Sequence, residues 1–376
     1  YNSFDGGTMT LKGNFHQLKG AADNFRADGT KVVFAGTDTQ EISFATPESS
    51  YFRYPVFENK DIRIMSGIGR WNLNEDLVIK DEGYPLEIIG GMNLTNPNGN
   101  TLTVERGVII KSSEYDGNID LNNGTIKIMG DLTQKAGYSG YNVNFNQGNL
   151  EVEGNLLQEA GVMNITEGKL EVAGDYRIQK YNEKKQSYEN SEGALRMGEE
   201  GELTVGGDFY TQSSDEYYNS FDGGTMTLKG NFHQLKGAAD NFRADETKVV
   251  FDGKDLQEVY IETPSASHIS NPVYKNTKVC YMGTRKIGLT QKNTTLKVAL
   301  PENANEVSKG IVYSEDAKPT LDTQGRTRVA FTETTDNAIT FDASGLEGNT
   351  FRAYIVIKDV AGDDHVFYTE PVGMAG

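Results

Sequence analysis

The sequence has 376 residues with 36 basic and 54 acidic side chains, which gives a formal net charge of −18 at pH 7. Binding to phosphate groups needs a surface rich in Lys and Arg, so this balance argues against a nucleic-acid partner. The single cysteine, Cys280, excludes an internal disulfide framework. No apolar run reaches the ~18 residues of a membrane-spanning helix, so we expect no membrane insertion in this part of the protein. We also expect a monomer.

A long internal repeat dominates the sequence. Residues 1–28 recur without change at 218–245, an offset of 217 positions, and a weaker similarity extends the match to 1–52 and 218–269. Repeats of this kind predict an array of stacked structural units. The sequence begins inside a repeat, so we expect it to be a fragment of a longer protein. We predict three domains: the end of one solenoid module at 1–65, a whole module at 66–282, and a different domain at 283–376.

Within the module, short segments share one pattern: apolar-x-apolar, a turn, apolar-x-apolar, and then Gly, Asn or Asp, and an apolar residue. Such short alternation predicts β-strands. We attribute the corner glycines to corners that need either a positive φ or a close approach of two backbones. They recur 20 to 33 residues apart, at Gly130, Gly154, Gly174, Gly207, Gly230 and Gly253.

This spacing matches one coil of a right-handed parallel β-solenoid, or β-helix, with three short strands per coil. We therefore predict an all-β fold. A string of antiparallel sandwiches would also fit short strands with regular turns, but it does not require a Gly-Asn/Asp corner in every repeat. In a solenoid, equivalent residues of successive coils stack about 4.8 Å apart.

The repeat pattern also predicts which side chains stack. Apolar positions such as Leu132, Leu156 and Phe232 are expected to point inward, whereas His16 and His233, which share one repeat position, are expected to face solvent. Glutamines two or three residues after the inward position predict a ladder of side-chain amides. Its members would be Gln134, Gln158, Gln179, Gln212 and Gln234.

From Arg285 onward the repeat pattern ends, and the sequence predicts seven strands separated by turns with Pro, Gly, Asn and Asp. Their ranges are 286–290, 294–300, 308–314, 327–332, 338–343, 350–358 and 365–370. This pattern is typical of an immunoglobulin-like sandwich. Residues 310–314 (Gly-Ile-Val-Tyr-Ser), together with 318–321 and 351–354, resemble a bacterial fibronectin type III-like domain. The tyrosine that this family places at one corner is Phe351 here, so its hydroxyl is missing.

The remainder resembles the parallel β-solenoid repeats of bacterial surface proteins of the filamentous-haemagglutinin-like adhesin kind. The motif Leu-x-Val-x-Gly-Asn/Asp-Phe-x-Gln carries this resemblance, together with residues 30–40, which read Thr-Lys-Val-Val-Phe-x-Gly-x-Asp-x-Gln. The resemblance implies secretion, display at a bacterial cell surface, and a role in adhesion or in spacing a tip from the cell. We therefore predict a non-catalytic structural and adhesive stalk.

The sequence carries no enzyme signature, and we predict no catalytic residue, cofactor or metal site. Residues 116–120 open like a calcium loop, but Leu121 stands where that loop needs Gly and Lys127 where it needs Glu. Calcium could still gather at Asp and Asn ladders of the solenoid corners. Parallel β-helices also host polysaccharide lyases and hydrolases that use clustered carboxylates. Outward acids that leave this alternative open are Glu151, Glu153, Glu171, Asp175 and Asp208.

A glycan-binding module is the other alternative. Aromatic side chains on insertions stack well on sugar rings, so we single out Tyr138, Tyr141, Tyr181 and Tyr188 as possible ligand contacts. The expected partner is a glycan, or a surface protein of a host or neighbouring cell.

Overall fold

The computed structural model describes residues 4–20, 24–94, 99–111, 118–135, 142–214, 219–238, 240–331 and 338–374. The protein is all-β, with 58% of residues in strands. It forms a parallel β-solenoid of about ten turns and C-terminal antiparallel sheets, which confirms the predicted fold class. Two compact units can be distinguished. Unit 1 comprises 1–230, 236–250 and 266–273, and unit 2 comprises 231–235, 251–265 and 274–376.

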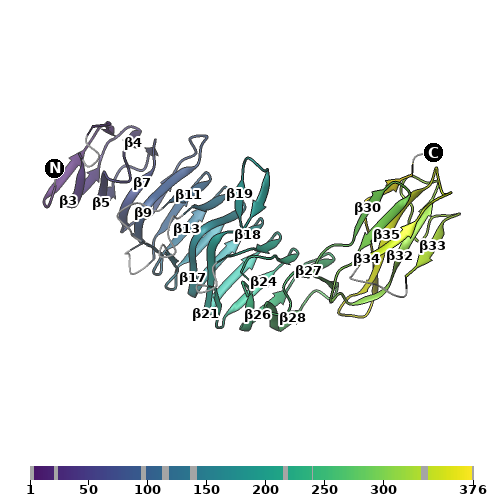
Figure 1. The fold of residues 1–376 in the computed structure, drawn as a ribbon. Helices are drawn as coiled ribbons and strands as arrows, with labels where there is room; N and C mark the ends of the chain where they lie inside the picture. Colours follow the sequence, from purple (N-terminus) through teal and green to yellow (C-terminus); the bar gives the residue numbers. More distant parts are fainter. Residues whose placement is uncertain are drawn as a thin grey trace. The chain divides into compact units, whose positions relative to one another are not determined.

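The coils of unit 1 have three faces, each built from parallel strands in register (Figure 1). Face A contains β8 (Leu77–Ile79), β10 (Thr101–Val104), β13 (Thr125–Ile128), β16 (Asn149–Val152) and β24 (Thr225–Leu228). Face B contains β11 (Val108–Lys111), β14 (Leu132–Lys135), β18 (Tyr176–Ile178) and β22 (Phe209–Thr211). Face C contains β12 (Ile119–Asp120), β15 (Asn142–Asn144) and β23 (Ser220–Phe221).

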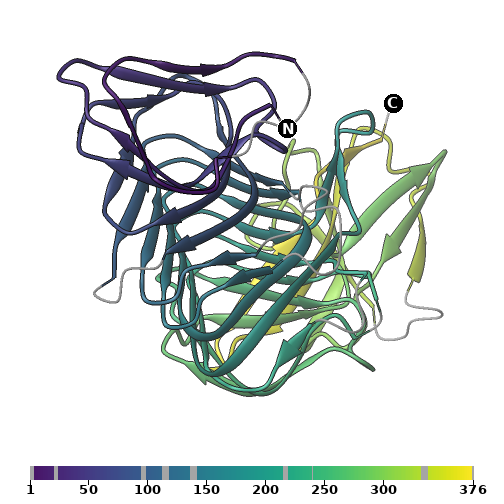
Figure 2. The same ribbon diagram turned by 90° about the vertical axis from the view of Figure 1, so that its left-hand side faces the viewer.

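Longer strands run around one or more corners and so belong to more than one face. They are β7 (Ile68–Leu73), β9 (Leu86–Leu94), β17 (Leu156–Val172), β21 (Glu192–Val205), β26 (Arg243–Phe251) and β28 (His268–Tyr274). The first coils form two further parallel sheets. One contains β1 (Thr8–Leu11), β3 (Arg26–Phe34) and β5 (Tyr51–Phe57), and the other β2 (Phe15–Gln17), β4 (Gln40–Phe44) and β6 (Ile62–Ile64). Figure 2 looks along these coils and shows them winding one behind another.

The interior of unit 1 is made of stacked apolar side chains. On face A, Leu102, Ile126, Leu150, Leu170 and Leu203 occupy equivalent register positions and are at most 3% exposed. Burying a side chain of this kind stabilises a fold by about 1.5–3 kcal/mol. The predicted inward position is confirmed on face B as well, where Leu132 pairs with Leu156 and both are fully buried. Repetition of these stacks holds the coils together without disulfides.

The Gly-Asn/Asp corners are explained by close approach between coils. The side-chain oxygen of Asp131 accepts the backbone N–H of Asn155 at 2.7 Å, and that of Asn155 accepts the backbone N–H of Asp175 at 2.9 Å. A Cβ on Gly154 would lie 2.4 Å from the same oxygen of Asp131. The φ of Gly154 is not in the left-handed region. Of the two reasons that the sequence left open, close approach is therefore the one that applies at this corner.

The predicted glutamine ladder is wrong as a single row. Gln134 and Gln158 are register partners inside the solenoid and are fully buried, but Gln158 hydrogen-bonds to backbone carbonyls and to Tyr176 rather than to Gln134. Gln179 and Gln212 follow the inward residues Tyr176 and Phe209 by three positions rather than two. They therefore lie on the side of the chain away from the solenoid interior, where Arg177 donates to Gln179. There the amide of Gln179 donates to Gln212 at 2.8 Å. Because successive side chains of a strand point to opposite sides, an even number of positions from an inward residue leads inward and an odd number leads outward.

Unit 2 begins with three parallel strands, β25 (Phe232–Gln234), β27 (Gln257–Ile261) and β29 (Val279–Gly283). Each of the seven strands predicted after residue 285 is present. They form two antiparallel sheets. One contains β30 (Gly288–Lys292), β31 (Thr295–Ala299) and β34 (Ala338–Asp342), and the other β32 (Glu306–Ser314), β33 (Thr327–Ala330), β35 (Thr350–Lys358), β36 (Asp364–Tyr368) and the short β37 (Val372–Gly373).

The two antiparallel sheets share one core. Leu296 and Val298 of β31 and Ile311 of β32 are buried together with Phe351 and Ala353 of β35. Phe351 is fully buried and its ring centre lies 5.0 Å from that of Tyr313. The corner position that lacks a hydroxyl therefore contributes to apolar packing.

A second apolar cluster in unit 2 joins the parallel strands to the antiparallel part. Tyr260 and Cys280 pack with Ile355 and Ile357 of β35. His233 lies beside this cluster, and its ring stacks on Tyr260 with centres 5.1 Å apart. The prediction that His16 faces solvent is confirmed, but the same prediction for His233 is wrong, because that residue is only 8% exposed. The Tyr260 ring that covers His233 stands where the first copy has Ser43 beside His16.

Candidate functional site

A row of polar side chains runs along the outside of face C. Its members are Asn72, Asn93, Asp120, Asn144 and Asn164, which are register partners on successive coils. They alternate along each strand with buried residues such as Trp71, Met92 and Val143. Alternation places them on the outer side, yet all five are half-buried. We call these five residues the polar row.

Hydrogen bonds connect neighbouring members of the polar row. The amide of Asn144 donates to the carboxylate of Asp120 at 2.7 Å, and the amide of Asn164 donates to the carbonyl oxygen of Asn144 at 3.0 Å. Asn93 accepts a hydrogen bond from the Asn122 amide at 2.8 Å. These bonds orient four of the five members, namely Asn93, Asp120, Asn144 and Asn164.

Two arginines stand at one end of the polar row. Arg53 belongs to β5 and Arg70 to β7. The pairing of β7 with β9 shifts register between Gly69 and Trp71, and Arg70 at this bulge has a φ of 26°. Positive φ is uncommon for a residue with a side chain, and it concentrates at functional positions. The bulge re-aims Arg70 relative to the regular alternation of the strand.

Asp28 and Tyr51 support the two arginines. The Tyr51 hydroxyl donates to the Asp28 carboxylate at 2.9 Å, and Arg70 donates to the Tyr51 oxygen at 3.4 Å. Arg53 lies 3.7 Å from the same carboxylate, measured from its Nε. Burial raises the pKa of Tyr51, and the hydrogen bond to Asp28 adds to the rise. Tyr51 therefore stays a neutral donor, and its hydroxyl links Arg70 to the Asp28 carboxylate that Arg53 approaches directly.

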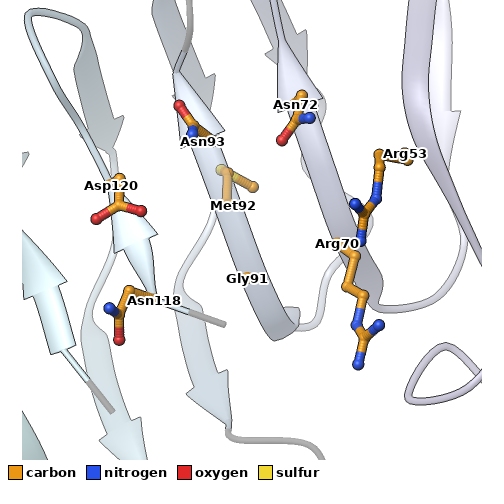
Figure 3. Close-up of a pocket in the computed structure, with 8 residues that line it drawn as sticks. All are labelled: Arg53, Arg70, Asn72, Gly91, Met92, Asn93, Asn118 and Asp120. Atoms are coloured by element: carbon orange, nitrogen blue, oxygen red, sulfur yellow. The ribbon is translucent and has the colours of Figure 1, made fainter. Parts of the chain in front are cut away.

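The two arginines and three members of the polar row, Asn72, Asn93 and Asp120, line a pocket of about 310 Å³ (Figure 3). The arginines lie at one end of the pocket, Asn118 and Asp120 at the other, and Asn72 and Asn93 between them on adjacent strands. Its lining is Arg53, Arg70, Asn72, Gly91, Met92, Asn93, Asn118 and Asp120. The pocket thus offers charged donors at one end, acceptors at the other, and amides that can do both. Such an arrangement suits a small ligand with many hydrogen-bonding groups.

Sequence reasoning missed this pocket, apart from noting Asp120 within the segment that opens like a calcium loop. A signal was present in the sequence. An apolar residue followed by Asn recurs about once per coil, at Trp71-Asn72, Met92-Asn93, Val143-Asn144 and Met163-Asn164. The arginines have no comparable signal, because Arg70 reaches the pocket through a bulge.

Two of the four tyrosines proposed as ligand contacts lie together. Tyr181 on β19 (Lys180–Asn182) and Tyr188 on β20 (Ser187–Glu189) are cross-strand partners in a hairpin that projects from the coils. Their ring centres lie 5.2 Å apart at 61°, and the residues are 40% and 42% exposed. This hairpin lies in the 33-residue interval between the corner glycines Gly174 and Gly207. Tyr138 and Tyr141 lie outside the described residues.

An arginine stiffens the tyrosine pair. The guanidinium of Arg177 lies 4.8 Å from the centre of the Tyr188 ring and 3.6 Å from that of Tyr210. It also pairs with Asp175 at 2.7 Å. Cation–π contacts of this kind hold the hairpin base in one geometry. The hairpin thus presents two exposed aromatic rings on a supported base.

The outward acids of the enzyme alternative contact cations or hydroxyls. Lys127 lies 3.4 Å from Glu151 and 3.3 Å from Glu153, and Lys169 pairs with Glu171. Asp208 accepts the Tyr210 hydroxyl at 3.1 Å. Hydrogen bonds to Glu153 and Glu151 raise the pKa of Lys127. These contacts are those of a solvated, charge-compensated face.

The described ranges contain neither a metal-binding cluster nor a membrane-spanning helix. Within them, no group of three or more His, Cys, Asp or Glu side chains could hold a metal ion. Asp116 of the calcium-like segment lies outside these ranges. None of the described residues belongs to a helix with the length and hydropathy required to cross a bilayer.

Comparison with known proteins adds no relative: no family model, curated protein or solved structure matches this chain.

Proposed function

We propose that this chain is a structural and adhesive stalk segment of a secreted bacterial surface protein, and that it is non-catalytic. The repeated module is the observation that carries the proposal. The strands β1 to β5 recur as β24 to β28 with every boundary displaced by 217 residues. Each coil of a solenoid contacts mainly its neighbours, so further copies add length without a new fold. A protein that gains length by repetition is suited to holding a binding element away from a surface.

The C-terminal part supports the same proposal. Its strands group as β30-β31-β34 and β33-β32-β35-β36, three strands against four, with β37 added beside β35. Together with the sequence resemblance, this grouping supports a fibronectin type III-like domain. Such domains commonly serve as spacers and contact modules in surface proteins, so the domain fits a stalk.

Glycan binding is the second candidate function, and the tyrosine hairpin favours it. Exposed, rigid aromatic rings gain contact area on a sugar ring at little cost in side-chain entropy. Tyr181 and Tyr188 provide two such rings on one projecting hairpin. An adhesive stalk with a glycan contact on its hairpin would unite the two candidates. The charge compensation of Glu151, Glu153 and Glu171 by lysines favours binding over hydrolysis.

A glycan array with the whole chain tests the proposal, with a parallel assay for new reducing ends on every polysaccharide that is retained. We expect retention without new reducing ends. Replacing Tyr181 and Tyr188 by Ala should lower binding about tenfold or more. Tyr54→Ala, at a residue 38% exposed in the first coils, is the matched control. New reducing ends in proportion to protein would contradict the non-catalytic assignment. Failure to bind any glycan or cell surface would contradict adhesion.

A further inference from the structure

We propose that the pocket at the end of the polar row binds an acidic sugar, with the sugar carboxylate at Arg53 and Arg70 and its hydroxyls along Asn72, Asn93 and Asp120. This inference rests on the proposed adhesive function and names a ligand class for it. The pocket and the tyrosine hairpin are built from different coils, so they can be tested separately.

The size of the pocket suits a single sugar residue. A volume of about 310 Å³ lies at the lower end of the range for small-molecule sites. Two polar residues of the wall are held by hydrogen bonds from residues outside the lining: Asp120 accepts the Asn144 amide at 2.7 Å, and Asn93 accepts the Asn122 amide at 2.8 Å. Pre-oriented polar groups of this kind pair well with ring hydroxyls, which are both donors and acceptors.

The distribution of charge in the pocket favours an acidic sugar over a neutral one. Arginine presents a planar fork that matches a carboxylate with two parallel hydrogen bonds. Arg53 lies 3.7 Å from the Asp28 carboxylate, Arg70 is linked to that carboxylate through the Tyr51 hydroxyl, and Asp120 stands at the far end of the pocket. The two arginines and the two carboxylates of Asp28 and Asp120 balance in formal charge, so a bare anion gains little from the site. A ligand with a carboxylate on one side and hydroxyls on the other gains at both ends.

The backbone at Arg70 supports the same assignment. A non-glycine residue with a φ of 26° stands at a register shift, where the regular strand would have placed its side chain differently. Strained residues concentrate at binding and catalytic positions, where the surrounding structure holds them. Arg70 thus lines the same pocket as Arg53 (Figure 3).

Ligand-observed NMR titration of the whole chain with glucuronic acid, glucose and acetate tests the proposal. Glucuronic acid and glucose differ only in a carboxylate for a hydroxymethyl group, and acetate supplies the anion alone. We expect glucuronic acid to bind about tenfold more tightly than either, since one charge-assisted pair supplies about that factor. Equal binding of acetate would reduce the site to an anion site, and equal binding of glucose would remove the acidic preference. Either result overturns the proposal.

Variants locate the binding. Arg53→Gln and Arg70→Asn should each weaken glucuronic acid binding about tenfold. Asn tolerates a positive φ, so the second change preserves the bulge. Arg53→Lys keeps the charge without the fork and should be intermediate. Arg63→Gln is the matched control, because Arg63 is exposed and lies 3.9 Å from Glu82, outside the pocket.

Far-UV circular dichroism confirms that each variant is folded. If folded Arg53 and Arg70 variants bind glucuronic acid as well as the unchanged chain does, the site is wrong. Should array glycans still bind in that case, and do so through Tyr181 and Tyr188, the adhesive function stands and only the pocket assignment falls. Loss of every interaction on the array would contradict the function itself.

Discussion

Residues 4–20 and 221–237 are identical in sequence and form the same strands, yet their surroundings differ. Met226 and Phe232 are fully buried, whereas Met9 and Phe15 of the first copy are only half-buried. Met226 is the register partner of Leu203 on the preceding coil. In the described part of the chain, Met9 pairs only with Val32 of the following strand. The local sequence sets the conformation, and the adjacent coils set how much each side chain contributes to stability.

A second difference lies where the copies diverge. Leu256, Tyr260 and Cys280 stand where the first copy has Thr39, Ser43 and Arg63. The first set belongs to the cluster that packs on β35, whereas Ser43 is hydrogen-bonded to His16 at 2.8 Å on an exposed surface. Three outward positions changed from polar to apolar thus convert a solenoid surface into a docking surface for the C-terminal sandwich. The burial of His233 follows from the same change.

The largest effect is expected from removing the buried aromatic ring. Phe232→Ala should lower the free energy of unfolding by about 3–5 kcal/mol, because a fully buried phenylalanine leaves a cavity. Phe15→Ala, the same change in the half-buried copy, should cost about 1–2 kcal/mol. Urea denaturation followed by circular dichroism measures both. Equal costs would show that the burial of the ring does not separate the copies.

An exchange of residues between the copies should give the next largest effect. Leu256→Thr combined with Tyr260→Ser introduces the residues of the first copy and should destabilise the attachment of the sandwich by about 2–3 kcal/mol. Differential scanning calorimetry should then resolve a separate transition for the sandwich. Ser43→Tyr is the control and should change stability by less than about 0.5 kcal/mol. An unchanged single transition in the double variant would argue against a docking role.

The histidine pair should give the smallest effect. His233→Ala removes a ring stacked on Tyr260 and should cost about 1 kcal/mol. His16→Ala removes an exposed side chain and should cost less than about 0.5 kcal/mol. In the Tyr260→Ser background, the cost of His233→Ala should fall to that of His16→Ala. Persistence of the larger cost there would mean that contacts other than the Tyr260 ring hold His233.

Much of the fold could be predicted from the sequence because period-2 alternation and the Gly-Asn/Asp corners are local signals. Leu132, Leu156 and the seven C-terminal strands were placed correctly from them. The glutamine ladder failed because Gln179 and Gln212 follow their inward residues by an odd number of positions. That difference can be read from the sequence by counting the positions between each glutamine and its inward residue.

The candidate site was harder to predict because its parts come from coils far apart in the sequence. Arg53, Arg70 and Asp120 line one pocket only because coils of different length stack in register, and Arg70 stands at a bulge. His233 was misplaced for a related reason. Its partner Tyr260 lies on another strand, in a segment where the copies differ. Local patterns identify strands, whereas sites and docking surfaces depend on the register between them.

Disulfide trapping tests the stacking of parallel coils most directly. Thr103 and Lys127 are register partners on adjacent coils of face A, and Lys127 is in turn the partner of Glu151. Adjacent strands are about 4.8 Å apart, within the range that a disulfide can bridge, whereas strands two coils apart are beyond it. Burial raises the pKa of Cys280 to about 12, so the native thiol should not compete. A chain with Thr103→Cys and Lys127→Cys should form an intramolecular disulfide on mild oxidation, and one with Thr103→Cys and Glu151→Cys should not. Efficient cross-linking of the second pair, or none of the first, would contradict the solenoid.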